Sequence, residues 1–239
     1  ISLMAANNEI GTIHPFAEIG AIAKERGVLF HCDATQAVGK IAFDVQTAGV
    51  DLVSITAHKM YGPKGAGALY VRRRDPEVKI APRSFGGGQE RGIRPGTLNV
   101  PGIVGLGACA RYAREDAAEE EPRIAALRDR LQARLFENID GITLNGHPEL
   151  RVPGNLNVSI AGTDSDSLIM ALPEIAISSG SACASGSVEP SKVLTVIGTP
   201  HAQAKSSIRF GVGRFNTAEE IEFAAERVIA AAKSLRHRR

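Results

Sequence analysis

Residues 1–100 alternate short apolar runs with one amphipathic segment, and Gly, Pro and Asn residues fall between them. The segment from about Pro15 to Arg26 places Ile19, Ile22 and Ala23 on one face, which predicts a helix. Strands connected in this way form an α/β sheet, so we expect them to be mostly parallel and buried. The apolar runs predict strands near residues 2–6, 28–32, 51–56 and 66–71.

Residues 101–137 have a helical pattern that connects this region to the next. Its apolar positions, such as Leu127, Leu131 and Leu135, alternate with charged residues, which predicts one long helix or two helices with a break. An acidic run at 115–121 is followed by Pro122, and proline is tolerated only in the first turn of a helix. A break at Pro122 is therefore one of the two predictions.

Residues 138–239 predict a smaller α+β unit. Thr217-Ala-Glu-Glu220 has the form of a capping box before the apolar positions of a final helix. The sequence thus divides into residues 1–100 of a large domain, a connecting helix region over 101–137 and a small C-terminal domain over 138–239. The other predicted elements are strands at 141–144, 154–160, 175–178 and 206–211, and helices near 164–172 and 190–198.

Composition excludes several classes of protein. The formal net charge is +2 and the basic residues are dispersed, so we expect no nucleic acid partner. No run approaches the roughly 20 apolar residues that span a bilayer, so we expect no membrane association. Three cysteines without CxxC spacing argue against a disulfide framework and a zinc site, and favour a reducing, cytoplasmic compartment.

Two strand ends carry the residue types of a cofactor site. Ser54-Ile-Thr-Ala-His-Lys-Met-Tyr-Gly runs from an apolar strand into a glycine-rich turn, and places Lys59 at the carboxyl edge of the sheet, where ligands bind in open α/β folds. A surface loop with an incidental basic pair is the simpler reading of Lys59 alone. Asp33 ends a second strand, and a carboxylate there requires a cation such as a protonated pyridine nitrogen. Alternation turns Cys32 away from His31 and Asp33, into the packing.

The motifs Asp-Ala-Thr-Gln36 and Thr56-Ala-His-Lys-Met-Tyr-Gly-Pro-Lys-Gly65 resemble those of fold-type I PLP enzymes of the aminotransferase class V group. The resemblance implies an α/β fold whose large domain binds pyridoxal 5′-phosphate (PLP). It also implies that Lys59 forms the Schiff base with PLP and that Asp33 pairs with the pyridinium nitrogen. The remaining expected cofactor contacts are Gln36 and Asn8 to the phenolic oxygen, and Thr56 and His58 to the phosphate.

Cys183 lies in Ser178-Ser-Gly-Ser-Ala-Cys-Ala-Ser-Gly-Ser187, a composition typical of a loop with a reactive thiol rather than a buried structural cysteine. The stretch resembles the catalytic loop of the NifS/IscS group of cysteine desulfurases. That resemblance implies that Cys183 accepts sulfur from L-cysteine as a persulfide, releases L-alanine and passes the sulfur to an iron–sulfur scaffold or another sulfur acceptor. Cys109 falls within the helical pattern, and we expect it in the core.

Two further residues are assigned through the resemblance. Arg209 lies in a β-rich run, where its guanidinium requires a carboxylate, either of the protein or of a ligand. By similarity Arg209 binds the α-carboxylate of the substrate, and Arg214 is the weaker candidate. The glycine-rich run 86–101 resembles a dimer-interface segment in which Thr97 reaches the cofactor phosphate of the partner subunit, which implies a homodimer.

The resemblance covers essentially the whole chain, but the family extends further at the N-terminus. Residues 1–6 read as the inside of a buried strand, so we expect an absent upstream part, which in the family contributes a phosphate-binding turn and a histidine that stacks on the PLP ring. Two alternatives stay open. One is another class V enzyme, a selenocysteine lyase or an aminotransferase, and the other is a catalytically incomplete fragment that keeps only dimer or scaffold contacts.

Overall fold

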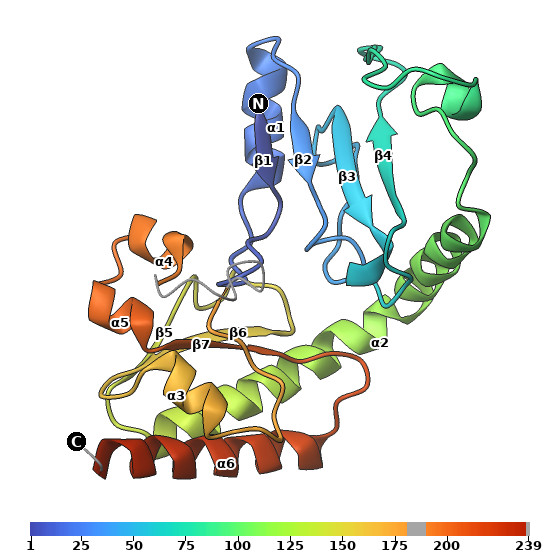
Figure 1. Cartoon of the computed structure of the whole chain (residues 1–239). Coiled ribbons are helices and arrows are strands. Elements are labelled where there is room, and N and C mark those ends of the chain that lie inside the picture. The colour runs from blue at the N-terminus through green and yellow to red at the C-terminus, as the bar shows by residue number, and fades with distance from the viewer. Residues whose placement is uncertain (181–189, 238–239) are drawn as a thin grey trace. The chain divides into compact units, whose positions relative to one another are not determined.

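The computed structural model describes residues 1–180 and 190–237 (Figure 1). The chain divides into two compact units, which are described separately. The first unit comprises residues 1–6 and 14–117, and the second comprises residues 7–13 and 118–239. The division falls inside one helix, and the short segment Asn7–Ile13 belongs to the second unit although strand residues of the first unit precede it.

A four-stranded sheet in the order β1-β2-β3-β4 forms the first unit. The expected parallel arrangement is confirmed for β1, β2 and β3, whose arrows point the same way in Figure 1, whereas β4 is antiparallel to β3. Register pairs Cys32 with Leu3 on one side and with Val53 on the other. The strands are β1 (Ser2–Met4), β2 (His31–Asp33), β3 (Leu52–Thr56) and β4 (Gly67–Val71), and the short 3₁₀ helices are η1 (Ala57–Lys59) and η2 (Gln89–Gly92).

The core of the first unit lies on one face of this sheet. Helix α1 (Phe16–Glu25) and the segment 34–50 pack there against Phe30, Cys32 and Val53. The expectation that all strands are buried is wrong for β1, since each of its residues is exposed, and for the first half of β4. These are the two edge strands, and each has only one neighbour among the described residues.

Helix α2 (Val100–Asn138) is continuous, so the structure has the long helix rather than the break at Pro122. Proline removes one backbone donor and leaves the carbonyl of the preceding turn without its helical partner. Pro122 and Ala118, one turn earlier, are both exposed, so water hydrates that carbonyl. None of the described helices is long and apolar enough to cross a bilayer.

The second unit packs helices against a three-stranded antiparallel sheet of β5 (Ile142–Leu144), β6 (Asn155–Ile160) and β7 (Ser207–Gly211). Its core joins Leu131 and Leu135 of α2 to Leu156 of β6 and Val228 of the last helix. The strand predicted at 175–178 is wrong, since only Ser178 forms an isolated bridge, with Arg209. The other helices are α3 (Ser165–Met170), α4 (Lys192–Val196), α5 (His201–Lys205) and α6 (Ala218–His237).

The predicted capping box of α6 is confirmed. Glu220 donates its amide N–H to Thr217 Oγ1 at 3.3 Å, and the Thr217 amide N–H reaches Glu220 Oε2 at 3.1 Å. Each side chain thus satisfies a backbone donor that the helix leaves unpaired. The cap fixes where α6 begins, and therefore which of its residues face the core.

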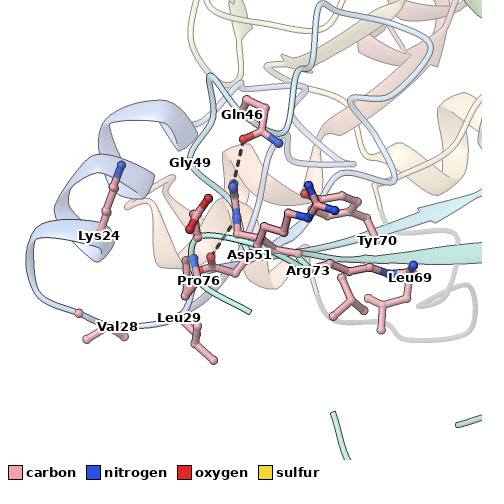
Figure 2. Close-up of a pocket in the computed structure, with 15 residues that line it drawn as sticks. Lys24, Val28, Leu29, Gln46, Gly49, Asp51, Leu69, Tyr70, Arg73 and Pro76 are labelled. Atoms are coloured by element: carbon pink, nitrogen blue, oxygen red, sulfur yellow. Dashed lines mark hydrogen bonds and ion pairs between the residues drawn. The ribbon is translucent and has the colours of Figure 1, made fainter. Parts of the chain in front are cut away.

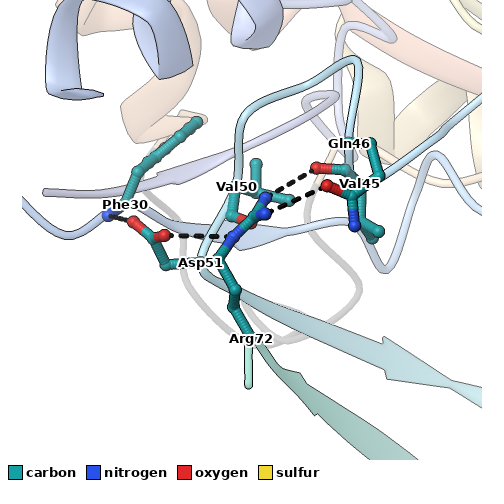
Figure 3. Close-up of polar contacts among 6 residues, drawn as sticks. All are labelled: Phe30, Val45, Gln46, Val50, Asp51 and Arg72. Atoms are coloured by element: carbon teal, nitrogen blue, oxygen red, sulfur yellow. Dashed lines mark hydrogen bonds and ion pairs between the residues drawn. The ribbon is translucent and has the colours of Figure 1, made fainter. Parts of the chain in front are cut away.

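A buried ion pair ties the end of β4 to the segment before β3 (Figure 3). Arg72 Nε lies 3.3 Å from Asp51 Oδ1, and the other Asp51 oxygen accepts the Phe30 amide N–H at 2.9 Å. The Arg72 guanidinium also donates to the carbonyls of Val50 and Val45 and to Gln46 Oε1 at 3.0 Å. Because these acceptors surround the guanidinium, the charge is compensated inside the fold.

We expect Asp51→Ala to destabilise the protein by about 3 to 5 kcal/mol, since it leaves the buried Arg72 guanidinium without its counter-charge. Urea unfolding followed by circular dichroism measures the change. The matched control is Glu77→Ala, which removes the exposed Glu77–Lys79 pair and should cost at most about 1 kcal/mol. Equal effects of the two substitutions would show that the buried pair is not the stronger constraint.

Candidate functional site

The carboxyl ends of β2 and β3 bring candidate cofactor residues to one edge of the sheet in the first unit. Register places Asp33, the last residue of β2, beside Ser54 of β3, and two residues later β3 ends at Thr56 and runs directly into η1 with His58 and Lys59. Parallel strands end at the same edge, so Asp33 and Lys59 share it. The Asp33 carboxylate accepts the Thr35 amide N–H at 3.0 Å and remains partly exposed.

A chain of hydrogen bonds crosses the polar face of the sheet beside Asp33. His31 Nδ1 lies 2.8 Å from Ser2 Oγ of β1, and its Nε2 lies 2.8 Å from Ser54 Oγ of β3. Strand alternation predicts that His31 shares this face with Asp33, and the alternation of burial in β2 confirms it. The sequence analysis did not predict the two serine partners, Ser2 and Ser54. They could have been found from the pairing of β1 and β3 with β2.

Thr56 and His58 contact each other through Thr56 Oγ1 and His58 Nδ1 at 2.9 Å, and Thr56 Oγ1 also donates to the Ala66 carbonyl at 3.2 Å. The one hydroxyl hydrogen of Thr56 goes to Ala66, so His58 Nδ1 donates to Thr56 Oγ1, and the two side chains fix each other at the end of β3. Within the described part of the chain, the exposed Lys59 ammonium makes no hydrogen bond or ion pair, so its amine is open to a ligand.

Two other candidates of the first unit have local partners. Lys40 Nζ donates to Gln36 Oε1 at 2.6 Å, which leaves the Gln36 amide nitrogen to donate elsewhere. Thr97 is exposed shortly before α2 begins, and its carbonyl accepts from Arg94 at 3.3 Å.

Arg209 and Asn8 belong to the second unit. Arg209 lies on β7 opposite Asn157 of β6, and its Nη1 donates to the Asn8 carbonyl at 2.7 Å. Burial lowers the pKa of the Arg209 guanidinium, and the Glu9 carboxylate acts in the opposite direction. No carboxylate of residues 1–180 and 190–237 lies within ion-pair distance of Arg209. Its guanidinium therefore forms no salt bridge within the described chain.

Arg214, the weaker candidate, has a different environment. It binds both oxygens of Glu120 at 2.7 and 2.8 Å, in the bidentate geometry that arginine and a carboxylate favour. Both side chains are largely buried. Arg214 is therefore committed to an intramolecular ion pair, and Arg209 remains the candidate for a ligand carboxylate.

The cysteines fall into two groups. The expectation that Cys32 and Cys109 are packing residues is confirmed, since both are buried and free. Burial raises the pKa of the Cys32 thiol to about 11, and the Asp33 carboxylate acts in the same direction. Cys183 lies outside the described residues.

A large cleft of the first unit lies elsewhere, with a volume of about 990 Å³ (Figure 2). Its wall includes Val28 and Leu29 before β2, Asp51 before β3, and the basic run that follows β4. These positions precede the parallel strands, so the cleft lies at the edge opposite Asp33 and Lys59. Open α/β sheets bind ligands at the carboxyl edge, and we therefore place the candidate site there rather than in the cleft.

Known proteins that are similar to this chain indicate its family. The chain matches the aminotransferase class-V family over residues 1–223. It is 58% identical over 224 residues to the cysteine desulfurase IscS of Anaeromyxobacter dehalogenans, covering 94% of this chain and 55% of that protein. It is 49% identical over 236 residues to human cysteine desulfurase, covering 99% of this chain and 51% of the human protein.

Solved structures give the same result. A NifS-like protein superposes with a TM-score of 0.87 at 34% identity, over 98% of this chain and 60% of that one. A structure of SspA in complex with cysteine superposes with a TM-score of 0.72 at 34% identity, over 91% of this chain and 59% of that one. The fold is therefore the α/β fold of NifS-like PLP enzymes.

The chain belongs to the aminotransferase class V family and, within it, to the IscS/NifS group of cysteine desulfurases. The family is PLP-dependent. The chain spans about half the length of the curated relatives it matches.

We expect Cys32 and Cys109 to resist iodoacetamide at about pH 8 in the folded protein because both are buried, and for Cys32 also because burial raises the pKa of its thiol. In guanidinium chloride both should be alkylated. Mass spectrometry of the cysteine peptides measures the two rates. Fast modification of Cys32 in the native protein would contradict its buried position.

Proposed function

We propose that this chain is the part of a cysteine desulfurase that carries the PLP-binding lysine and the sulfur-accepting cysteine, and that it acts on L-cysteine. The observation that supports this most strongly is the parallel register that brings Asp33 and Lys59 to one sheet edge. Family membership supports the reaction, and the relative bound to cysteine supports the substrate class.

The residues at this edge fit PLP chemically. Asp33 offers a carboxylate oxygen for the pyridinium nitrogen, and Lys59 offers an amine that has no partner among residues 1–180 and 190–237. Thr56 and His58 are proposed to bind the phosphate, where a bound phosphate would replace Ala66 as the acceptor of the Thr56 hydroxyl, and the Gln36 amide nitrogen is left to donate to the phenolic oxygen. Asn8 is proposed as a second donor to that oxygen.

Bound PLP supplies an electron sink for the substrate Cα. Lys59 would hold the cofactor covalently, and its free amine would move the proton at Cα of the substrate. Arg209 binds the substrate α-carboxylate through its planar fork, which orients the thiol of the substrate. Arg209 is half-buried, and among the described residues its side chain donates to the Asn8 carbonyl and has the Glu9 charge nearby, which leaves room for a further anionic partner.

Cys183 accepts the sulfur. Its thiolate attacks the substrate Sγ, the Cβ–Sγ bond breaks with its electrons on the carbon side, and Cβ takes a proton. The products are L-alanine and a persulfide on Cys183, so atoms and electrons balance without another oxidant. The persulfide then passes to an iron–sulfur scaffold or another sulfur-acceptor protein, in a reducing compartment such as the cytoplasm.

The active protein is proposed to be a homodimer in which Thr97 reaches the cofactor phosphate of the partner subunit. The exposed position of Thr97 before α2 is compatible with this role. A second candidate function is a fragment that folds but does not turn over, and the observation that favours it is the coverage of only about half of the relatives' length.

We expect borohydride to fix added PLP on Lys59, because reduction makes the bond between the lysine amine and the cofactor aldehyde permanent. Peptide mapping by mass spectrometry locates the pyridoxyl group. Lys59→Ala should abolish the labelling, while Lys64→Ala, which removes an exposed lysine of the same turn, should leave it unchanged.

Turnover separates the two candidate functions. With L-cysteine as the substrate, PLP-loaded protein that has not been reduced, that releases L-alanine and that loses this activity in Cys183→Ser is a desulfurase. Labelling of Lys59 without turnover supports the incomplete fragment, and labelling spread over several lysines contradicts the assignment of the cofactor site.

A further inference from the structure

The three-stranded sheet of the second unit has a polar face that is buried. Val158 of β6 belongs to the apolar core, so strand alternation puts its neighbours Asn157 and Ser159 on the opposite face. Asn157 and Ser159 are 0% and 1% exposed, and Ser207, which pairs with Ser159 from β7, is 0% exposed. A buried polar side chain is costly unless it is hydrogen-bonded, so each of these side chains requires a partner.

The directions of the hydrogen bonds on this face follow from its last acceptor. Ser207 Oγ donates its one hydrogen to the Gln203 carbonyl at 2.9 Å, so it accepts from Ser159 Oγ at 2.8 Å. Ser159 Oγ in turn accepts from Asn145 Nδ2 at 2.9 Å, and the other hydrogen of that nitrogen goes to Asn157 Oδ1 at 2.8 Å. The longer contacts of Asn145 with Ser159 and Ser207, at 3.2 Å, do not involve Asn157. The Asn157 oxygen is thereby fixed as an acceptor, and its amide nitrogen is left to donate.

Asn157 uses this amide nitrogen to hold a backbone carbonyl. Its Nδ2 donates to the Glu9 carbonyl at 3.0 Å, and Asn155 Nδ2 donates to the same carbonyl at 3.2 Å. The Ile10 carbonyl accepts from Arg151 Nη2 at 3.0 Å. Two consecutive backbone carbonyls are therefore held by side chains from β6 and from the chain just before it.

The next carbonyl toward the N-terminus, that of Asn8, orients Arg209. Arg209 Nη1 donates to it at 2.7 Å. The Asn8 carbonyl belongs to the planar peptide unit that ends at the Glu9 nitrogen, so bonds that hold Glu9 also hold this carbonyl. Among residues 1–180 and 190–237, Nε and Nη2 of Arg209 form no hydrogen bond, which leaves one edge of the planar fork for a carboxylate.

We infer that Asn157 is a positioning residue that holds the peptide between Asn8 and Glu9 and thereby directs the free edge of Arg209. The inference deepens the proposed function and rests on it, because that function assigns Arg209 to the α-carboxylate of the substrate. Without the donor from Asn157, the Glu9 carbonyl keeps the longer bond from Asn155, and the peptide that orients the guanidinium is held less firmly. Asn157 therefore acts on the substrate through Arg209.

The experiment is ¹⁵N NMR of the whole chain, labelled on arginine and without added PLP. In the wild type we expect separate signals for Nη1 and Nη2 of Arg209, because the bond to the Asn8 carbonyl opposes rotation of the guanidinium about the Cζ–Nε bond. Arg209→Lys assigns these signals by removing them. Asn157→Ala removes the donor to Glu9 and should speed the rotation by up to about fivefold, the factor that corresponds to one hydrogen bond of about 1 kcal/mol.

The matched control is Val158→Ala, which truncates the next residue of the same strand on the opposite, apolar face. It opens a cavity and destabilises the unit but leaves the donor to Glu9 in place, so the rotation rate of Arg209 should equal that of the wild type. Arg214, whose guanidinium binds both oxygens of Glu120, should keep its signals in every variant.

Turnover relates this orientation to the substrate. In PLP-loaded, unreduced protein that releases L-alanine, Asn157→Ala should raise KM for L-cysteine and leave kcat unchanged, because the carboxylate is bound equally before and during the reaction. A loss confined to kcat would contradict a role through Arg209.

Equal rotation rates in the wild type and Asn157→Ala, equal acceleration in Val158→Ala, or merged Nη signals of Arg209 in the wild type would each overturn the inference. If Asn157→Ala does not fold, Asn157→Thr is measured instead, since threonine refills most of the volume but is too short to reach the Glu9 carbonyl. The NMR measurement needs neither cofactor nor turnover, so its failure leaves the proposed function standing. Conversely, failure of Lys59 labelling leaves the orientation of Arg209 by Asn157 intact.

Discussion

The candidate site depends above all on the parallel register of β2 and β3. That register places Asp33 beside Ser54, so the strand that ends in a carboxylate and the strand that runs into Lys59 finish at one edge. The Asp51–Arg72 pair supports the arrangement from the opposite edge, where Asp51 accepts the amide of Phe30 just before β2 begins. A slip of one residue would turn His31 and Asp33 into the core and Cys32 out of it, which the fully buried Cys32 opposes.

Much of this could be predicted from the sequence because the signals are local. Alternation in β2 predicts the faces of His31 and Cys32, and the Thr217–Glu220 capping box predicts where α6 begins, because neither depends on distant residues. The break at Pro122 was one of two predictions, and the structure has the continuous helix, in which Pro122 and Ala118 are both exposed. The strand at 175–178 failed because strand formation requires a partner, and only Ser178 finds one, on β7.

The contacts that join distant positions could not be predicted in this way. Ser191 and Glu9 are 182 residues apart, and Arg209 and Asn8 are 201 apart, so no periodicity relates them. The sequence left two partners possible for Arg209, an internal carboxylate or a ligand. Arg214 shows the first case, since its guanidinium binds both oxygens of Glu120. In both cases the structure adds the partner of a buried polar group, which residue type alone does not identify.

The exposed edge strand β1 has a consequence for the behaviour of the chain in solution. Ile1, Leu3 and Met4 are 51%, 45% and 37% exposed, and β1 has β2 as its one neighbour in the described sheet. An apolar edge with unpaired amides and carbonyls is a template for strand addition, and natural proteins blunt such edges with charges, proline or a cover. Residues 1–6 contain neither a charged side chain nor a proline, so within the described sheet nothing in β1 itself opposes the addition of a further strand at this edge.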